Sequence, residues 1–462
     1  MLAAIAATPC ARTAARMCGR SLRERDLRGL RRHAVAGRSS TLTTGLPIAP
    51  CSLARTVVAH NPRMPPRRWI AHLDMDAFYA SVELLRYPEL TGQAVVIGGG
   101  RRHQPRARAD GSREFATLAA YKGRGVITTA TYPARDLGVH SGMGLMKAAL
   151  LAPQAVLLPV DHDEYKRYSR RFKAAVAEVA PCIEDRGIDE IYIDLSEVPG
   201  AQDAVGHDRF GGVRALALEI KNSVRRATGL SCSIGLTPNK LLSKIASDLD
   251  KPDGLTLLTL DDVPAQIWPL PVRRINGIGP KAALKLAALG ITRIGELAER
   301  DLAFLVEHFG KSYGRWLHDA AHGCDERPVV TISEPVSMSR ETTFDRDLHA
   351  KADRPELSRV FTELAQAVAH DLQRKGYAGR TIGIKLRFDD FKTVTRDITL
   401  PHPVDDAHAI RQAAGQCLKR VDLARRIRLL GVRAGTLVRA RDLPAAPSAA
   451  AAETERELFA GG

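Results

Sequence analysis

The chain has 462 residues and a formal net charge of +16. No run of about 18 apolar residues occurs, which argues against a membrane-spanning helix. The length exceeds what one hydrophobic core fills, so we expect about three or four domains. The positive charge favours a polyanionic partner, the alternative being a basic protein without one. Seven cysteines without a CxxC pair argue against zinc ribbons and disulfide frameworks and fit a reducing compartment.

The first 63 residues contain eleven arginines, two acidic residues and no lysine. Two interpretations compete. The segment has the composition of a transit peptide, and it also fits a misassigned upstream start, with Met64 opening the chain. We favour the second, because the first predicted strand begins only a few residues after Met64. In either case we exclude residues 1–66 from the fold and expect them to be disordered.

Strands and helices alternate from residue 69 to residue 237. We first predict a buried strand over 69–74, a helix over 77–85 and an apolar strand over 93–100. An exposed Arg- and Gly-rich loop over 101–115 follows, and then a strand, turns and a helix over 126–151. The remaining elements are a helix over 163–180, a hairpin around Gly187 and Ile188, a helix over 210–229 and a strand over 231–237. Such an order predicts a mixed sheet backed by helices.

From residue 253 the pattern becomes helical. Gly277–Ile278–Gly279 precedes Pro280, which suits a first helical position, and 308–323 looks like a second such unit. Residues 336–445 carry 21 basic and 14 acidic residues. There we predict helices over 356–372 and 407–421 and strands over 381–388, 394–400 and 427–438, the order of a split βαβ unit, βαββαβ. Residues 443–462 are rich in Ala and Pro and predict a flexible tail.

Acidic residues cluster at two distant places. Asp74 ends the first strand, with Asp76 close behind, and Asp189 and Glu190 lie at the predicted hairpin. Antiparallel pairing of these segments would gather carboxylates that repel one another unless a cation neutralises them. Mg²⁺ prefers such a site, completed by substrate phosphates. The alternative for the Asp-Glu dipeptide alone is a solvated turn.

Five motifs in order carry a resemblance: DMDAFYASVE, TYPARDLGVHSGM, GIDEIYIDLS, SIGLTPNKLLSKIASDLDKPDG and SRETTF. Over about residues 67–440 the chain resembles a Y-family translesion DNA polymerase of the bacterial DNA polymerase IV type. The resemblance implies an α+β, multidomain right hand: palm over 67–77 and 161–252, fingers over 78–160 with an insertion at about 100–124, helix-hairpin-helix thumb over 253–325, linker over 326–337 and βαββαβ little finger over 338–442.

The implied activity is low-fidelity, template-directed addition of dNTPs to a primer 3′-hydroxyl, without proofreading and with two Mg²⁺ ions. The resemblance implies that Asp74 and Asp189 bridge both ions, that Glu190 holds the catalytic ion, and that Met75 contributes its backbone carbonyl. Asp76 corresponds to a residue beside these metal ligands and is not assigned as a ligand.

For the nucleotide, the resemblance implies a steric gate at Tyr79 and triphosphate contacts from Tyr132, Arg135 and Lys251. The alternatives are a core aromatic for Tyr79, a surface charge for Arg135 and a turn residue for Lys251. Lys244 and Asp248, four residues apart on one predicted helix, could form a plain ion pair.

Contacts to primer–template DNA are expected from the Gly277 and Gly279 backbone and from Lys385 and Arg387 on the strand at 381–388. The alternatives are a plain turn and a solvated sheet face. The tail resembles a sliding-clamp peptide through Leu458 and Phe459, although Glu455 replaces the usual leading Gln. We expect a monomeric bacterial cytoplasmic protein that binds no membrane. A scaffold that has lost its metal carboxylates and a nucleotide cyclase are the rival functions.

Overall fold

The computed structural model describes residues 67–208 and 210–442. The predicted disorder of residues 1–66 and the predicted tail at 443–462, with Leu458 and Phe459, lie outside the described residues. Within the described ranges no helix combines the length and apolar character needed to cross a membrane.

A five-stranded sheet in the order β10-β9-β1-β8-β7 forms the first core. Its strands are β1 (Ile70–Met75), β7 (Ile183–Asp185), β8 (Glu190–Asp194), β9 (Cys232–Thr237) and β10 (Leu255–Leu257). β1 runs antiparallel to both β8 and β9. The predicted strands at 69–74 and 231–237 and the predicted hairpin around Gly187 are therefore confirmed.

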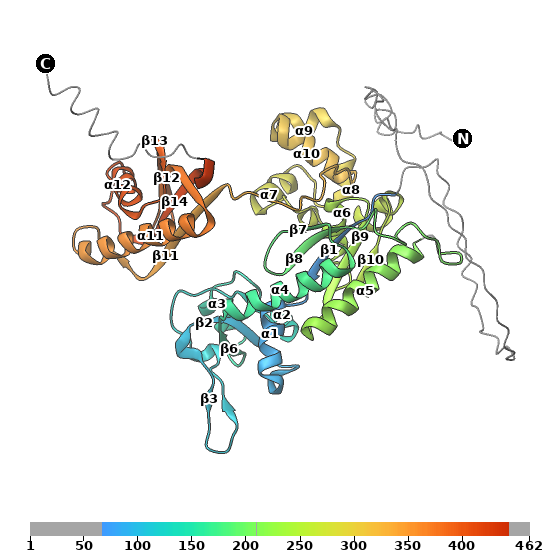
Figure 1. Ribbon diagram of the computed structural model, residues 1–462, viewed down its shortest axis with the longest axis horizontal. Coiled ribbons are helices and arrows are strands. Elements are labelled where there is room, and N and C mark those ends of the chain that lie inside the picture. The colour runs from blue at the N-terminus through green and yellow to red at the C-terminus, as the bar shows by residue number, and fades with distance from the viewer. Residues whose placement is uncertain (1–66, 209, 443–462) are drawn as a thin grey trace, which may run out of the picture. The chain divides into compact units, whose positions relative to one another are not determined.

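Helices α1 (Phe78–Arg86), α4 (His162–Val179), α5 (Gly211–Thr228) and α6 (Lys240–Ala246) accompany this sheet (Figure 1). Because side chains alternate along a strand, β1 has two different faces. Ala71, Leu73 and Met75 join one apolar core with Phe78 of α1 and Phe172 of α4. The residues between them, His72 and Asp74, therefore belong to the other face of the sheet.

One prediction for this region was wrong. We expected all-helical structure from residue 253, yet β10 pairs in parallel with β9, from Leu255↔Ile234 to Leu257↔Leu236. The strand is three residues long. A stretch of that length contains too little alternation to reveal a strand from sequence.

A smaller, three-stranded sheet in the order β5-β2-β6 carries the predicted fingers. It comprises β2 (Val95–Gly99), β5 (Thr129–Ala130) and β6 (Val156–Pro159), with helices α2 (Tyr132–Asp136) and α3 (Leu145–Leu151). The segment predicted as an exposed loop is exposed, but it contains a two-stranded hairpin, β3 (Arg106–Ala107) and β4 (Arg113–Glu114), which projects below this sheet in Figure 1.

The predicted helical region contains α7 (Pro280–Ala288), α8 (Ile294–Ala298), α9 (Leu302–Phe309) and α10 (Lys311–Ala321). Pro280 opens α7, as expected. Gly277 has φ of +117°, and a Cβ there would lie 2.7 Å from a ring carbon of Trp316. Both the backbone angle and the packing therefore require glycine at this turn.

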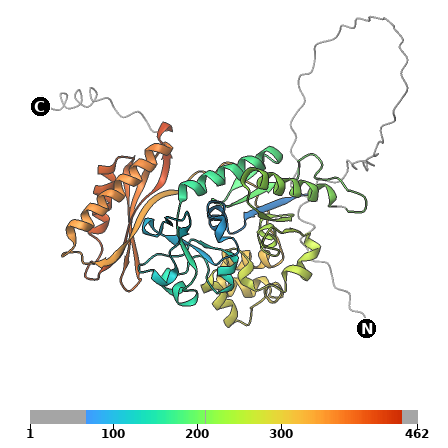
Figure 2. The same ribbon diagram turned by 90° about the horizontal axis from the view of Figure 1, so that it is seen from below.

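The last domain has the predicted βαββαβ order. Its elements are β11 (Ser337–Leu348), α11 (Arg354–Lys375), β12 (Tyr377–Phe388), β13 (Thr393–Val404), α12 (Ala407–Leu418) and β14 (Ile427–Arg439). The antiparallel sheet has the order β11-β14-β12-β13, and both helices lie against one face of it (Figures 1 and 2). On β12, Ile382, Ile384 and Leu386 are buried in the core, as the alternating pattern predicts.

Candidate active site

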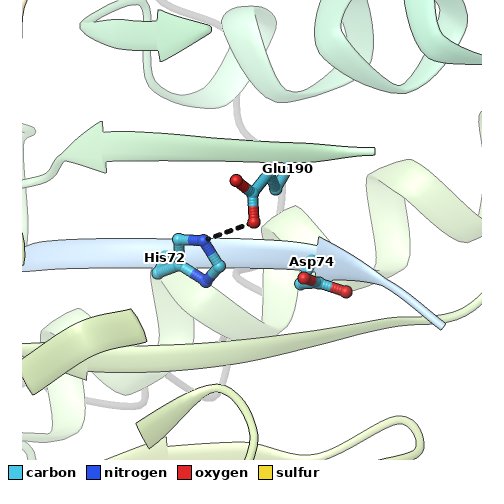
Figure 3. A group of neighbouring side chains, drawn as sticks. All are labelled: His72, Asp74 and Glu190. Carbon is cyan, nitrogen blue, oxygen red and sulfur yellow. Dashed lines mark ion pairs between the residues drawn. The ribbon is translucent and has the colours of Figure 1, made fainter. Parts of the chain in front are cut away.

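The two acidic clusters meet in the centre of the five-stranded sheet. Antiparallel pairing of β1 with β8 sets Asp74 directly opposite Glu190. Such cross-strand neighbours have their Cβ atoms about 5 Å apart. Ligand atoms of His72, Asp74 and Glu190 all lie within 4.8 Å of one another, and Figure 3 shows the three side chains on adjoining strands. The convergence expected of Asp74 and Glu190 is present.

Asp189 directly precedes Glu190, at the turn that leads into β8. Its backbone carbonyl accepts a hydrogen bond of 3.0 Å from Met75 N, which fixes the turn before β8 against the end of β1. Burial raises the pKa of the Asp189 carboxyl, and the negative charges of Asp74 and Glu190 raise it further. A carboxyl group that resists ionisation beside two others indicates a site that favours a cation.

Two residues that we did not assign from sequence contact Glu190. His72 is fully buried, and its Nε2 lies 3.5 Å from Glu190 Oε2 (Figure 3). On the other side of the ring, its Nδ1 is 2.8 Å from Ser247 Oγ. Lys244 donates to the same Glu190 oxygen. The hydrogen bond with His72, together with the Lys244 ammonium, lowers the pKa of Glu190 to about 2. Glu190 is therefore held ionised at neutral pH.

Asp76 points into a different environment. Its carboxylate accepts hydrogen bonds from Ser231 Oγ at 2.8 Å, from Ser233 Oγ at 2.8 Å and from Asp253 N at 2.8 Å. It is also 3% exposed. These bonds tie the end of β1 to β9 and to the loop before β10. Asp76 thus has a structural position beside the cluster, which agrees with its omission from the ligands.

Lys251 lies next to the acidic cluster. Its Nζ is 2.7 Å from Asp74 Oδ1 and 2.9 Å from Asp248 Oδ1. Burial opposes the charge of Lys251, but Asp74 and Asp248 more than offset burial and raise its pKa. The alternative pairing of Lys244 with Asp248 was wrong: helix α6 ends at Ala246, so the two residues are not one helical turn apart.

Tyr79 lies at the start of α1, beside the carboxylates. Its ring stacks on Tyr165 with centroids 4.2 Å apart and an interplanar angle of 12°. Tyr165 is itself buried and donates a hydrogen bond of 2.8 Å to Glu83. Burial raises the pKa of Tyr79, and the Asp189 charge raises it further. The ring is therefore rigidly supported within electrostatic reach of Asp189.

Tyr132 and Arg135 come from α2 of the smaller sheet. The Tyr132 hydroxyl is buried and has no hydrogen-bond partner in residues 67–208 or 210–442. Burial raises the pKa of this phenol and the charges of Asp76 and Asp74 raise it further, whereas Arg135 and Lys251 partly offset the increase. The Arg135 guanidinium carbon lies 4.8 Å from the centroid of the Tyr132 ring. A buried donor without an acceptor, close to Lys251, suits an anionic ligand.

The expected DNA contacts lie outside this cluster. Gly277 and Gly279 form the turn before α7. Lys385 pairs with Glu341 at 2.8 Å, and Arg387 Nε donates to Thr393 Oγ1 at 3.0 Å, both on the sheet face away from the buried residues of β12. Nothing in the structure tests their contact with DNA, which stays a prediction.

Comparison with known proteins agrees with this architecture. Residues 73–248 match the impB/mucB/samB family, 261–291 match its helix-hairpin-helix motif and 335–445 match its C-terminal domain. The chain is 40% identical over 370 residues to DNA polymerase IV of Methanoculleus marisnigri, covering 80% of this chain and 94% of that protein. It is 37% identical over 373 residues to DNA polymerase IV of Alkalilimnicola ehrlichii, covering 80% and 96%.

A solved structure is similar as well. A Y-family DNA polymerase chimera superimposes with a TM-score of 0.65 at 24% identity, covering 80% of this chain and 99% of that chain. The chain belongs to the impB/mucB/samB family, the Y family of DNA polymerases. The expected fold class and the resemblance to the DNA polymerase IV type are both confirmed.

The different environments of the two aspartates give opposite predictions for stability in EDTA at pH 7. Asp76→Asn should lower the free energy of unfolding by about 1–3 kcal/mol. The asparagine amide group would face hydrogen-bond donors that the native carboxylate accepts from.

Asp189→Asn should raise the free energy of unfolding, because it removes a carboxylate that the folded protein destabilises, as the raised pKa of Asp189 indicates. That gain should vanish as the pH falls through the raised pKa towards the unfolded value, since the native carboxyl is then protonated. Urea midpoints measured over this pH range check both changes; a loss for Asp189→Asn would contradict the repulsive cluster.

Proposed function

We propose that this protein extends a DNA primer opposite template bases, including damaged ones, by adding dNTPs to the 3′-hydroxyl. Membership of the family makes it a DNA-directed DNA polymerase of the translesion type, acting with low fidelity and without proofreading. The observation that carries the proposal is the antiparallel pairing that sets Asp74 opposite Glu190, with Asp189 at the turn before β8 and bonded through its backbone to the end of β1. The rival scaffold function requires these carboxylates to be lost, and a cyclase does not need a domain that grips a duplex.

The donor set fits a hard divalent cation. Carboxylate oxygens are the ligands that Mg²⁺ prefers, and burial together with nearby negative charge raises the pKa of Asp189, an environment that a bound cation would favour. The family uses divalent metal, and we propose two Mg²⁺ ions held by Asp74, Asp189, Glu190 and the Met75 carbonyl. Such ions, when bound, supply charge neutralisation at the phosphates and ease deprotonation of the attacking hydroxyl.

The chain's own residues would then orient the reactants. The reaction is in-line attack of the primer 3′-hydroxyl on the α-phosphate of the dNTP, with pyrophosphate leaving. His72 and Lys244 keep Glu190 ionised and fixed in place, so that it can serve as a ligand near the hydroxyl. Because the carboxylates are positioned by paired strands, little reorganisation accompanies the reaction.

Three residues would hold the triphosphate. The unpaired Tyr132 hydroxyl can donate to a phosphate oxygen, and Arg135 can bind one through its planar guanidinium. Lys251, beside Asp74, would supply a third contact, the second that is positively charged. Together they would place the β- and γ-phosphates between α2 and the acidic cluster.

The stacked position of Tyr79 supports the steric gate. Displacement of its ring is opposed by Tyr165, which stacks against it and is itself hydrogen-bonded within the core. A ring held in this way below the sugar would leave no room for a 2′-hydroxyl.

The remaining proposals concern partners. Gly277 and Gly279 would bind a DNA phosphate through backbone N–H groups, and Lys385 and Arg387 would follow the duplex backbone. We propose that the protein works as a monomer in the cytoplasm and binds a sliding clamp through Leu458 and Phe459, which lie outside the described residues.

Asp189→Ala should abolish primer extension with Mg²⁺, lowering kcat by at least about a thousandfold because a metal-bridging carboxylate is lost. Asp185→Ala is the matched control: Asp185 lies on the same hairpin, and its exposed side chain pairs with Lys173. The control variant should extend primers normally. Extension that survives Asp189→Ala would refute the assigned cage.

Tyr132→Phe should raise the KM for dNTP roughly tenfold, because a hydrogen bond to a charged phosphate is worth about 1.5 kcal/mol or more. The urea midpoint should not fall, since the hydroxyl has no protein partner in the described ranges. Steady-state kinetics would be compared with Tyr168→Phe, a tyrosine on α4. Equal KM values for Tyr132→Phe and wild type would remove Tyr132 from the triphosphate contacts.

Tyr79→Ala should lower the preference for dNTP over rNTP by at least about tenfold, because the space next to the sugar becomes open. Tyr79→Phe keeps the ring and its stacking on Tyr165, so it should retain the preference. Single-nucleotide incorporation with dCTP and CTP opposite template G provides the measurement. Unchanged sugar discrimination in Tyr79→Ala would show that another residue is the gate.

A further inference from the structure

The insertion between β2 and β5 is a built part of the smaller sheet. Residues 116–118 run antiparallel beside β6: Leu157 N donates to Ala116 O at 2.8 Å, Leu118 N donates to Ala155 O at 2.9 Å, and Thr117 bridges Val156. Leu118 is fully buried in the core of this sheet. The insertion is thus attached to the β6 edge through an isolated β-bridge at Thr117, and its hairpin precedes this bridge in the chain.

The hairpin is anchored to neighbouring elements by several contacts. Arg106 pairs with Glu114 in the β3–β4 ladder, and Gly111 takes the left-handed φ of +83° at the turn. A two-stranded hairpin alone is marginally stable in water, so its anchors matter. Phe115 packs edge-on against Tyr87 with centroids 5.6 Å apart. Arg113 also lies over the Tyr87 ring and pairs with Glu89, which fastens β4 to the end of α1.

The insertion that carries this hairpin is strongly basic. Residues 101–124 contain seven Arg and Lys residues and two acidic residues. Arg101 and Arg106 are exposed and have no carboxylate partner within the described ranges, and Arg108 approaches Glu114 only to 3.8 Å. Arg101 lies just before the hairpin and Arg106 lies on β3, so this anchored segment exposes unpaired guanidinium groups that are suited to phosphates along a flexible strand.

The position of the insertion relates it to the proposed nucleotide site. Thr131, just before α2, pairs with Val95 at the start of β2, and the start of β2 pairs in turn with Val156 beside Thr117. The start of α2 and the bridge at Thr117 therefore lie at the same end of the sheet, three strand spacings or about 15 Å apart. A nucleic-acid strand stacked at about 3.4 Å per nucleotide would need about four nucleotides to cover that span.

We propose that this hairpin binds the unpaired 5′ part of the DNA template, about four or more nucleotides ahead of the templating base. The proposal rests on the polymerase function but needs no catalysis for its test. Electrostatic contacts of this kind lack sequence preference and weaken with salt, so the contact would retain the template strand during synthesis over varied sequence.

Binding of two primer–template DNAs, with 5′ overhangs of 2 and 15 nucleotides, tests the proposal in EDTA by fluorescence anisotropy. The variant is Arg101→Ala/Arg106→Ala, and the matched control is Lys147→Ala/Arg170→Ala, which removes the same charge from exposed positions on α3 and α4. The hairpin variant should bind the long-overhang DNA roughly tenfold more weakly. Its salt slope, −log K against log [salt], should fall by about 1.4, from two contacts at about 0.7 each.

With the 2-nucleotide overhang the hairpin variant should bind like wild type, and the control variant should show no dependence on overhang length. Equal weakening on both DNAs would overturn the proposal, because it would show only a general charge effect. Unchanged binding on both DNAs would also overturn it and would leave the hairpin as a solvated loop or a protein-binding surface. Since no nucleotide is incorporated, failure here is distinct from failure of the polymerase assignment.

Discussion

The register between β1 and β8 is the constraint on which the site depends. It places Asp74 opposite Glu190 and brings the Asp189 turn against the end of β1. Shifting this pairing by one residue would turn Asp74 towards the apolar core and expose Leu73. Burial of alternate residues of β1 therefore specifies the position of the carboxylates. The pairing of β1 with β8 thus links burial of the apolar core to the positions of the carboxylates.

The same constraint creates an electrostatic cost. Burial raises the pKa of the Asp189 carboxyl, and the negative charges of Asp74 and Glu190 raise it further. Nearby groups limit that cost: Lys244 and His72 contact Glu190, and Lys251 contacts Asp74. Each carboxylate thus has a distinct environment. This arrangement is typical of functional sites. There, clustered charges lower the local stability of the fold but give the site a strong preference for cations and phosphates.

Much of this structure could be predicted from residue patterns. The strand ending at Asp74, the Gly187 hairpin and the alternating residues of 381–388 appear where periodicity indicates, because one buried face dictates each of them. Assignment of the metal carboxylates depended on the family motifs, since an Asp-Glu dipeptide is common in turns. His72 was the missed signal: a polar residue in the middle of an otherwise apolar strand indicated a second, functional face.

Other features could not be predicted because they depend on tertiary contacts. The Glu190 contact with Lys244 and the three donors around Asp76 come from segments more than fifty residues away. The isolated bridge at Thr117 leaves no alternating pattern in the sequence; it forms because the β6 edge offers backbone partners. Nor does sequence show that the Tyr132 hydroxyl is buried without an acceptor.

The most direct measurement of the central claim is anomalous diffraction from crystals grown with Mn²⁺, primer–template DNA and a non-hydrolysable dNTP analogue. The account predicts two anomalous peaks, each at about 2.1 Å from carboxylate oxygens of Asp74 and Asp189, with Glu190 bound to one of them. Peaks confined to other residues, or a nucleotide whose phosphates lie away from this cluster, would contradict it.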